Sequence, residues 1–167
     1  MAKKELFNNE PYMIGWEETI KGDRWTFIKT GPAVCVIPFR KKTGNGLELL
    51  LIQEKRLGKT ILKTVSCYLR GLEPTEGANK ALLEEAGVTT QKLSVLCPEM
   101  VGFDVIRLPI TLFLAHGWEV VQEGIAKNIV IGLEQAVEKV LNNEIGDQGA
   151  VDAILRIYVL HCCNCLP

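Results

Sequence analysis

The stretch with the most evident chemical potential is ALLEEAGV, residues 81–88, where Glu84 and Glu85 stand side by side. The small and apolar residues before them and Gly87 after them predict a helix that ends at the glycine. Carboxylates gathered on one side of a helix are ligands for a hard cation such as Mg²⁺, which leaves coordination positions open for substrate phosphates. The alternative is a solvated face of a surface helix, and the pair alone does not decide between the two.

The spacing leaves this potential site incomplete. Residues i, i+3 and i+4 of a helix share one face, so position 81 belongs with Glu84 and Glu85. Position 81 is an alanine and supplies no ligand. The sequence therefore offers two of the three oxygen donors that such a face could present.

Length and composition set the frame for this site. The chain has 167 residues, 47% hydrophobic and 23% charged, which suits one globular domain with a core. A net charge of −1 gives no global field toward nucleic acid or a membrane surface. The apolar runs are far shorter than the roughly 20 residues of a spanning helix, and the polar N-terminus lacks a signal peptide's apolar core. We expect a single domain over 1–167, located in the cytoplasm, with neither nucleic acid nor membrane as a partner.

Periodicity predicts the elements that must position the carboxylates. In the first half we expect a hairpin of residues 16–20 and 24–30, strands at 33–39 and 47–56, and a turn at Asn45-Gly46. Residues 59–71 look like a loop. In the second half we expect a helix over 74–87, strands within 92–100 and 107–120, and helices within 132–146 and 149–161. This order predicts a mixed α/β sandwich.

The segment around the carboxylates resembles the Nudix box. That box reads glycine, five residues, glutamate, seven residues, and R-E-U-x-E-E-x-G-U, where U is a bulky aliphatic residue. KALLEEAGV, residues 80–88, stands in place of its last nine positions, with Lys80 for the arginine and Ala81 for the first metal-binding glutamate. An ungapped count places Ser66 at the first glycine and Leu72 at the first glutamate, with Glu73 one residue late. The matching positions are Leu82, Glu84, Glu85, Gly87 and Val88.

Beyond the box, residues 12–160 are similar to the ADP-ribose pyrophosphatase branch of Nudix proteins. The resemblance implies an α+β fold, namely a Nudix-type α/β/α sandwich with a mixed sheet and N-terminal antiparallel strands. It divides the chain into N-terminal strands over 1–30, a core over 31–160 and a cysteine-rich tail over 161–167. It implies a nucleotide-like small molecule as ligand, with Mg²⁺ or Mn²⁺ as cofactor if the protein is active.

The resemblance also assigns roles to individual residues. A Q-x-x-R-like element at the end of strand 47–56 supplies two of the substrate contacts. As implied by the resemblance, the metal ligands are Glu84, Glu85 and Glu73, the catalytic residues are Glu84, Glu85 and Glu123, and the substrate contacts are Gln53, Arg56 and Lys80.

The departures from the family pattern are at positions where the resembled family has metal-binding or catalytic residues. Besides Ala81, three residues without acidic side chains, Ala126, Lys127 and Asn128, stand near where acids are expected, and ILKTVS replaces an E-x-P-A-G-like run. Two hypotheses follow. The protein is a nucleotide-binding module with weak or lost catalysis, or it is an active, divergent Mg²⁺-dependent hydrolase that cleaves a nucleoside diphosphate linked to another group.

Aromatic and sulfur-containing residues suggest further features. Trp16 and Trp25 are candidates for a homodimer surface, which the resemblance also implies, although they could equally cap the monomer core. We expect His116, at the end of an apolar strand, to be structural rather than catalytic. His161 with Cys162, Cys163 and Cys165 could bind zinc, but the spacing favours a frayed end with exposed thiols.

Overall fold

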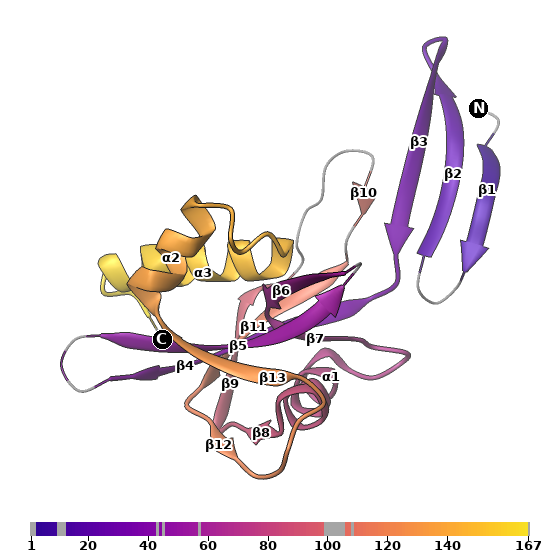
Figure 1. Ribbon diagram of the computed structural model, residues 1–167. Helices are drawn as coiled ribbons and strands as arrows, with labels where there is room; N and C mark the ends of the chain where they lie inside the picture. The colour runs from indigo at the N-terminus through magenta and orange to yellow at the C-terminus, as the bar shows by residue number, and fades with distance from the viewer. Residues whose placement is uncertain are drawn as a thin grey trace.

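A computed structural model describes residues 3–9, 13–42, 44, 46–56, 58–98, 106–107 and 109–166, the side chains of 106 and 107 excepted. The predicted turn residue Asn45 and residues 99–105 lie outside these ranges. Figure 1 shows a layered body of helices and sheet with a separate N-terminal sheet beside it. The expected α/β/α sandwich with a mixed sheet and N-terminal antiparallel strands is confirmed.

The centre of the body is a seven-stranded mixed sheet. In spatial order its main path is β13 (Lys127–Gly132), β5 (Leu47–Arg56), β4 (Ala33–Lys41), β11 (Ile110–His116) and β9 (Lys92–Cys97). Two short strands extend it, β6 (Lys59–Lys63) against β5 and β7 (Val65–Tyr68) against β4. Strands β4 and β11 run parallel, and the other pairs of this sheet are antiparallel.

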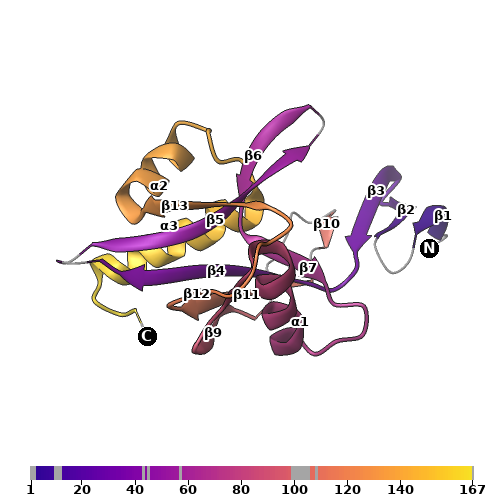
Figure 2. The ribbon, with the colours of Figure 1, turned by 60° about the horizontal axis from the view of Figure 1, so that its bottom comes forward.

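Both faces of this sheet are buried, because successive side chains of a strand point to opposite faces. Along β5, Leu49 and Leu51 join one core cluster, while Leu50 and Ile52 join the other. The first cluster packs against α2 (Leu133–Leu141) and α3 (Gln148–Cys162). The second packs against α1 (Pro74–Ala81) and its continuation η1 (Leu82–Ala86). Figures 1 and 2 show α1 and the α2–α3 pair on opposite sides of the sheet.

The helix that carries the two glutamates has the predicted bounds and one unexpected turn. Pro74 occupies its first position, where a missing N–H costs nothing, and Gly87 ends it in the left-handed conformation with φ 65°. Its last turn, η1, is a π-helix. Short β8 (Val88–Thr89) follows directly and pairs with β12 (Glu119–Val120).

The N-terminal sheet contains β1 (Lys3–Asn9), β2 (Met13–Ile20), β3 (Asp23–Thr30) and β10 (Ile106–Arg107). The predicted hairpin is present, with Lys21 and Gly22 both at positive φ in its two-residue turn. The four-stranded sheet stands to one side of the body (Figure 1). Strand β10, which comes from the segment that leads to β11, pairs with β3 in parallel.

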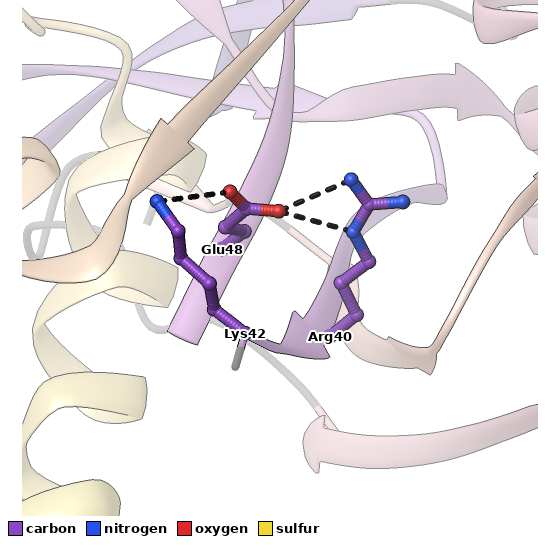
Figure 3. Close-up of polar contacts among 3 residues, drawn as sticks. All are labelled: Arg40, Lys42 and Glu48. Atoms are coloured by element: carbon purple, nitrogen blue, oxygen red, sulfur yellow. Dashed lines mark hydrogen bonds and ion pairs between the residues drawn. The ribbon is translucent and has the colours of Figure 1, made fainter. Parts of the chain in front are cut away.

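Ion pairs hold the turn end of the β4–β5 hairpin. Glu48 on β5 bonds the Arg40 guanidinium at 3.1 Å and the Lys42 ammonium at 3.6 Å (Figure 3). The same guanidinium lies over the Trp118 ring, 4.2 Å from its centroid. These contacts satisfy both oxygens of Glu48, so this cluster is a structural brace rather than an open binding site.

Some sequence expectations were wrong in detail. Residues 59–71 are not a loop, because 59–63 and 65–68 form β6 and β7. The expected strand over 107–120 is broken after His116 by Gly117 at φ 67°. Strand 33–39 continues through Pro38 to Lys41, and α3 runs on to Cys162. Strand β13, in the segment expected to hold an acidic loop, was not predicted. Short strands that add to an existing sheet carry too few residues for a period of two to stand out.

Helix α3 lies close to the sheet and begins at a specific cap. A Cβ on Gly149 would lie 2.9 Å from the Cys35 sulfur, so the first turn needs a residue without a side chain. The Asp147 carboxylate accepts a hydrogen bond from the Ala150 N–H at 2.9 Å. This bond satisfies one of the free donors at the helix start.

We predict that Asp147→Ala lowers the free energy of unfolding by about 1 kcal/mol, because the variant loses the cap. Asp147→Asn keeps an acceptor oxygen at the same position and should retain most of the stability. Urea unfolding followed by circular dichroism measures both. Equal stability of the alanine variant and the parent would contradict the capping role.

Candidate functional site

The candidate site is a pocket of about 470 Å³ at the end of β5. It lies between the central sheet and the C-terminal turn of the glutamate-bearing helix. Three of the predicted site residues, Gln53, Arg56 and Glu85, line it together although they come from two distant segments. The remaining lining residues are Glu54 and Lys55 of β5, Lys63 of β6, and Ile125 and Ala126 of the segment before β13.

Glu84 and Lys80 lie outside this pocket. Both side chains are about half exposed, and the Lys80 ammonium is 4.0 Å from a Glu84 oxygen, one helical turn away. Exposed pairs of this kind contribute little to stability. Of the two adjacent glutamates, Glu85 faces the pocket and Glu84 lies on the solvated face of the helix.

Glu73 and Glu123, which the sequence analysis expected to take the place of acidic residues of the resembled family, also do not line the pocket. Glu73 is exposed at the N-terminal end of α1, where its carbonyl accepts the Gly77 N–H. Glu85 is twelve positions further along the chain, which corresponds to about 18 Å along a helix axis. Glu123 is exposed in the loop that contacts η1, and Ala126 is the residue of that loop that reaches the pocket together with Ile125.

The donor set does not fit a multi-carboxylate metal cage. Ala81, which the sequence resemblance places at a metal-binding glutamate, is buried with 1% exposure in the core cluster under the helix. Among the described residues, no group of three or more histidine, cysteine, aspartate or glutamate side chains is close enough to share a metal ion. Glu85 alone represents the helix carboxylates in the pocket.

A residue that the sequence analysis did not single out is central to the pocket. Lys63 has only 7% of its surface exposed, and its ammonium lies 2.7 Å from a Glu54 oxygen. Arg56 contacts the other oxygen of Glu54 at 3.5 Å. The hydrogen bond from Lys63 lowers the pKa of the Glu54 carboxyl, so Glu54 is ionised at neutral pH. The sequence feature that could have indicated this buried lysine is its place within ILKTVS, residues 61–66, where every other residue is uncharged.

One loop fixes the pocket wall that Glu85 occupies. The last carbonyls of a helix have no partner within it, and here residues 121–128 supply the donors. The backbone N–H groups of Ile125 and Ala126 bond the carbonyls of Glu84 and Glu85 at 3.0 and 2.9 Å. The Gln122 side chain donates to the Leu83 carbonyl at 3.1 Å, and the Asn128 side chain donates to the Ala86 carbonyl at 2.8 Å. The Gly87 carbonyl accepts from the backbone N–H groups of Val121 and Gln122, at 2.9 and 3.2 Å.

The remaining chemical candidates do not join this site. His116 contacts the Ser94 hydroxyl at 2.8 Å and the edge of Phe39, and burial lowers its pKa, so it is a neutral structural residue at physiological pH. Burial raises the pKa of the Cys35 thiol to about 11, which keeps it a neutral core residue. In the tail, Cys162, Cys163 and Cys165 are exposed free thiols.

Comparisons with known proteins agree with this architecture. A crystal structure of an ADP compounds hydrolase superposes with a TM-score of 0.71, covering 99% of this chain and 95% of that one, at 14% sequence identity. The chain has a Nudix-like fold. No family model matches the sequence, and no curated protein does. The likeness therefore shows the fold alone, and the chemistry must be argued from the pocket.

We predict that Gly87→Ala destabilises the protein by about 1–3 kcal/mol, the usual cost of a strained backbone position. Gly87 has φ 65°, and an added Cβ would lie 2.2 Å from the Gln122 carbonyl oxygen, so the variant must separate the loop from the helix. Thermal unfolding of the two proteins measures the loss.

The matched control is Gly146→Ala, because an added Cβ there meets no atom within 4 Å and φ is not positive. We expect this variant to change stability by less than about 0.5 kcal/mol. Equal losses at the two glycines would argue against the importance of the contact between the loop and the helix.

Proposed function

We propose that the protein binds a nucleotide-like ligand through its diphosphate in the pocket at the end of β5, and that hydrolysis is weak or lost. The observation that carries this proposal is the set of charges in the pocket. Lys55, Arg56 and Lys63 provide three cations, and Glu54 and Glu85 provide two carboxylates. An excess of cations over carboxylates in a concave site favours a polyanionic group.

The dimensions and the local backbone support ligand binding here. A volume of about 470 Å³ lies within the usual range of small-molecule sites. Arg56 offers a planar guanidinium suited to phosphate oxygens, and Gln53 offers an amide for a neighbouring polar group. The π-helical turn η1 forms one wall, and such turns occur frequently at functional sites. ADP-ribose is our leading ligand, in agreement with the ADP compounds hydrolase of similar fold.

The weak or lost hydrolysis follows from the donors that reach the pocket. Glu85 is the helix carboxylate present, Ala81 is in the core, and Glu123 does not line the site. Loss of a general base typically lowers a rate about 10² to 10⁴-fold, so binding can persist where turnover does not. The alternative, an active Mg²⁺- or Mn²⁺-dependent hydrolase, predicts turnover that depends on Glu85.

We predict that ADP-ribose raises the melting temperature of the protein and that Arg56→Met weakens its binding roughly tenfold or more, the loss expected for a charged hydrogen bond. Arg24→Met, an exposed arginine of the N-terminal sheet, is the matched control and should bind as the parent does. Isothermal titration calorimetry with ADP-ribose, ADP and AMP measures the affinities.

The same protein is then incubated with Mg²⁺ or Mn²⁺ and a panel of ADP-ribose, dinucleotides and nucleotide sugars, and released phosphate groups are measured. Turnover that disappears in Glu85→Gln would establish the alternative, an active hydrolase. If no member of the panel binds or is cleaved, the pocket is not a nucleotide site.

We also propose that the N-terminal sheet forms a homodimer contact. Trp16 is buried at 7% exposure, stacked on Phe27 and covered by the Lys3 ammonium, so it caps its own sheet. Trp25 lies on the same face as Trp16, because Phe27 is the cross-strand partner of Trp16 and Trp25 is two residues from Phe27 along β3. The Trp25 side chain is 45% exposed. An aromatic side chain exposed on a projecting sheet is a typical anchor of an interface.

Light scattering should therefore give the mass of a dimer for the parent protein and that of a monomer for Trp25→Glu. Leu141→Glu, which changes an exposed leucine at the end of α2, is the control and should remain a dimer. A monomeric parent at micromolar concentration would exclude the proposed contact.

A further inference from the structure

We infer that the Lys63 ammonium serves this pocket as a built-in cation, so that diphosphate binding needs no divalent metal. This inference rests on the proposed function, because it concerns how the same pocket holds its ligand. It names Lys63 as the central phosphate contact and predicts a ligand preference for a diphosphate over a single phosphate.

The first support is the burial of Lys63. Among the described residues, it is the only charged residue that is buried, with 9% of its side chain exposed. Removing an ammonium from water is costly unless it is paired and hydrogen-bonded. Glu54 provides that pairing and holds the ammonium in the wall of the pocket, where it is fixed in position for an anionic ligand.

The second support is the direction in which Lys63 points. It pairs with Ile52 across the β5–β6 ladder, so it shares the sheet face of Ile52. That face belongs to the core cluster packed against the glutamate-bearing helix. Glu54 and Arg56 follow Ile52 at intervals of two along β5 and lie on the same face. Lys63, Glu54 and Arg56 therefore line the side of the pocket that faces Glu85.

The third support is unused bonding capacity. An ammonium carries three N–H donors, and Glu54 provides the one carboxylate partner that the described residues offer Lys63. Lys63 lines the pocket together with Arg56 and Lys55. A diphosphate carries several acceptor oxygens and would bridge Lys63 and Arg56, whereas a single phosphate would engage them less fully.

The same arrangement disfavours a metal ion. Glu54 is already paired with Lys63 and Arg56, which leaves Glu85 as the carboxylate of the pocket without such a partner. A divalent cation bound at Glu85 would share the pocket with a fixed ammonium, and like charges in a site of reduced dielectric repel strongly. With the Lys63 ammonium in place of a metal ion, the pocket binds the diphosphate although position 81 carries no metal-binding carboxylate.

The test is calorimetric titration of ADP-ribose into the whole protein, in EDTA and in millimolar Mg²⁺. We expect the dissociation constant of the parent to be the same in the two buffers within about twofold. In EDTA, the dissociation constant of Lys63→Met should be roughly tenfold or more above that of the parent. Lys59→Met, on the same strand but exposed and outside the pocket, should bind within about twofold of the parent. AMP should bind more weakly than ADP in the parent.

A second variant guards against misfolding. Glu54→Gln with Lys63→Met removes both charges, so no carboxylate is left without its partner, and it should show the same loss of affinity. Binding by the parent that requires Mg²⁺, or binding by a folded Lys63 variant equal to that of the parent, would overturn the inference. Absence of binding with and without Mg²⁺ would refute the proposed function and this inference with it.

Discussion

The arrangement of the site depends on the hydrogen bonds that the carbonyl groups at the C-terminal end of the α1–η1 helix accept. Five carbonyl groups in succession, from Leu83 to Gly87, accept hydrogen bonds from residues 121–128. Free carbonyls at a helix end are costly when they are not exposed to water, so the loop and the helix specify each other's position. Gly87 and Gly124 permit the approach, since a Cβ on either would lie within 2.5 Å of the other segment. The wall formed by Glu85 and Ala126 is a consequence of this packing.

Opposite that wall, the sheet supplies charge of the other sign. The family resembled here would gather glutamates on the helix and balance them with metal ions. In this chain the helix contributes Glu85, while β5 and β6 contribute Arg56 and a buried Lys63. The pocket lining has more cations than carboxylates, which is why we propose that it binds an anionic ligand without a metal. The fold itself depends on continuous apolar runs along β4, β5 and β11, which bury both faces of the sheet and are separate from the charged residues of the pocket.

Much of the fold could be predicted from the sequence, and less of the site. The long helix was delimited by Pro74 and Gly87, and the central strands at 33–39 and 47–56 were predicted from their apolar runs. Joining Gln53 and Arg56 to Glu85 required the family resemblance, because nothing local relates segments about thirty residues apart. Lys63 was missed because burial of a lysine depends on tertiary packing. Glu73 and Glu123 were chosen by position along the chain, which does not reveal that helix length and loop direction keep them away from the pocket lining.

The most direct test of this account is a crystal structure of the protein with ADP-ribose, grown in the presence of Mg²⁺. We predict that the diphosphate lies in the pocket at the end of β5, with its oxygens within hydrogen-bonding distance of the Lys63 ammonium and the Arg56 guanidinium. No metal ion should bridge the ligand to Glu85. A diphosphate held by Mg²⁺ on Glu84 and Glu85, or a nucleotide bound elsewhere on the molecule, would contradict the account.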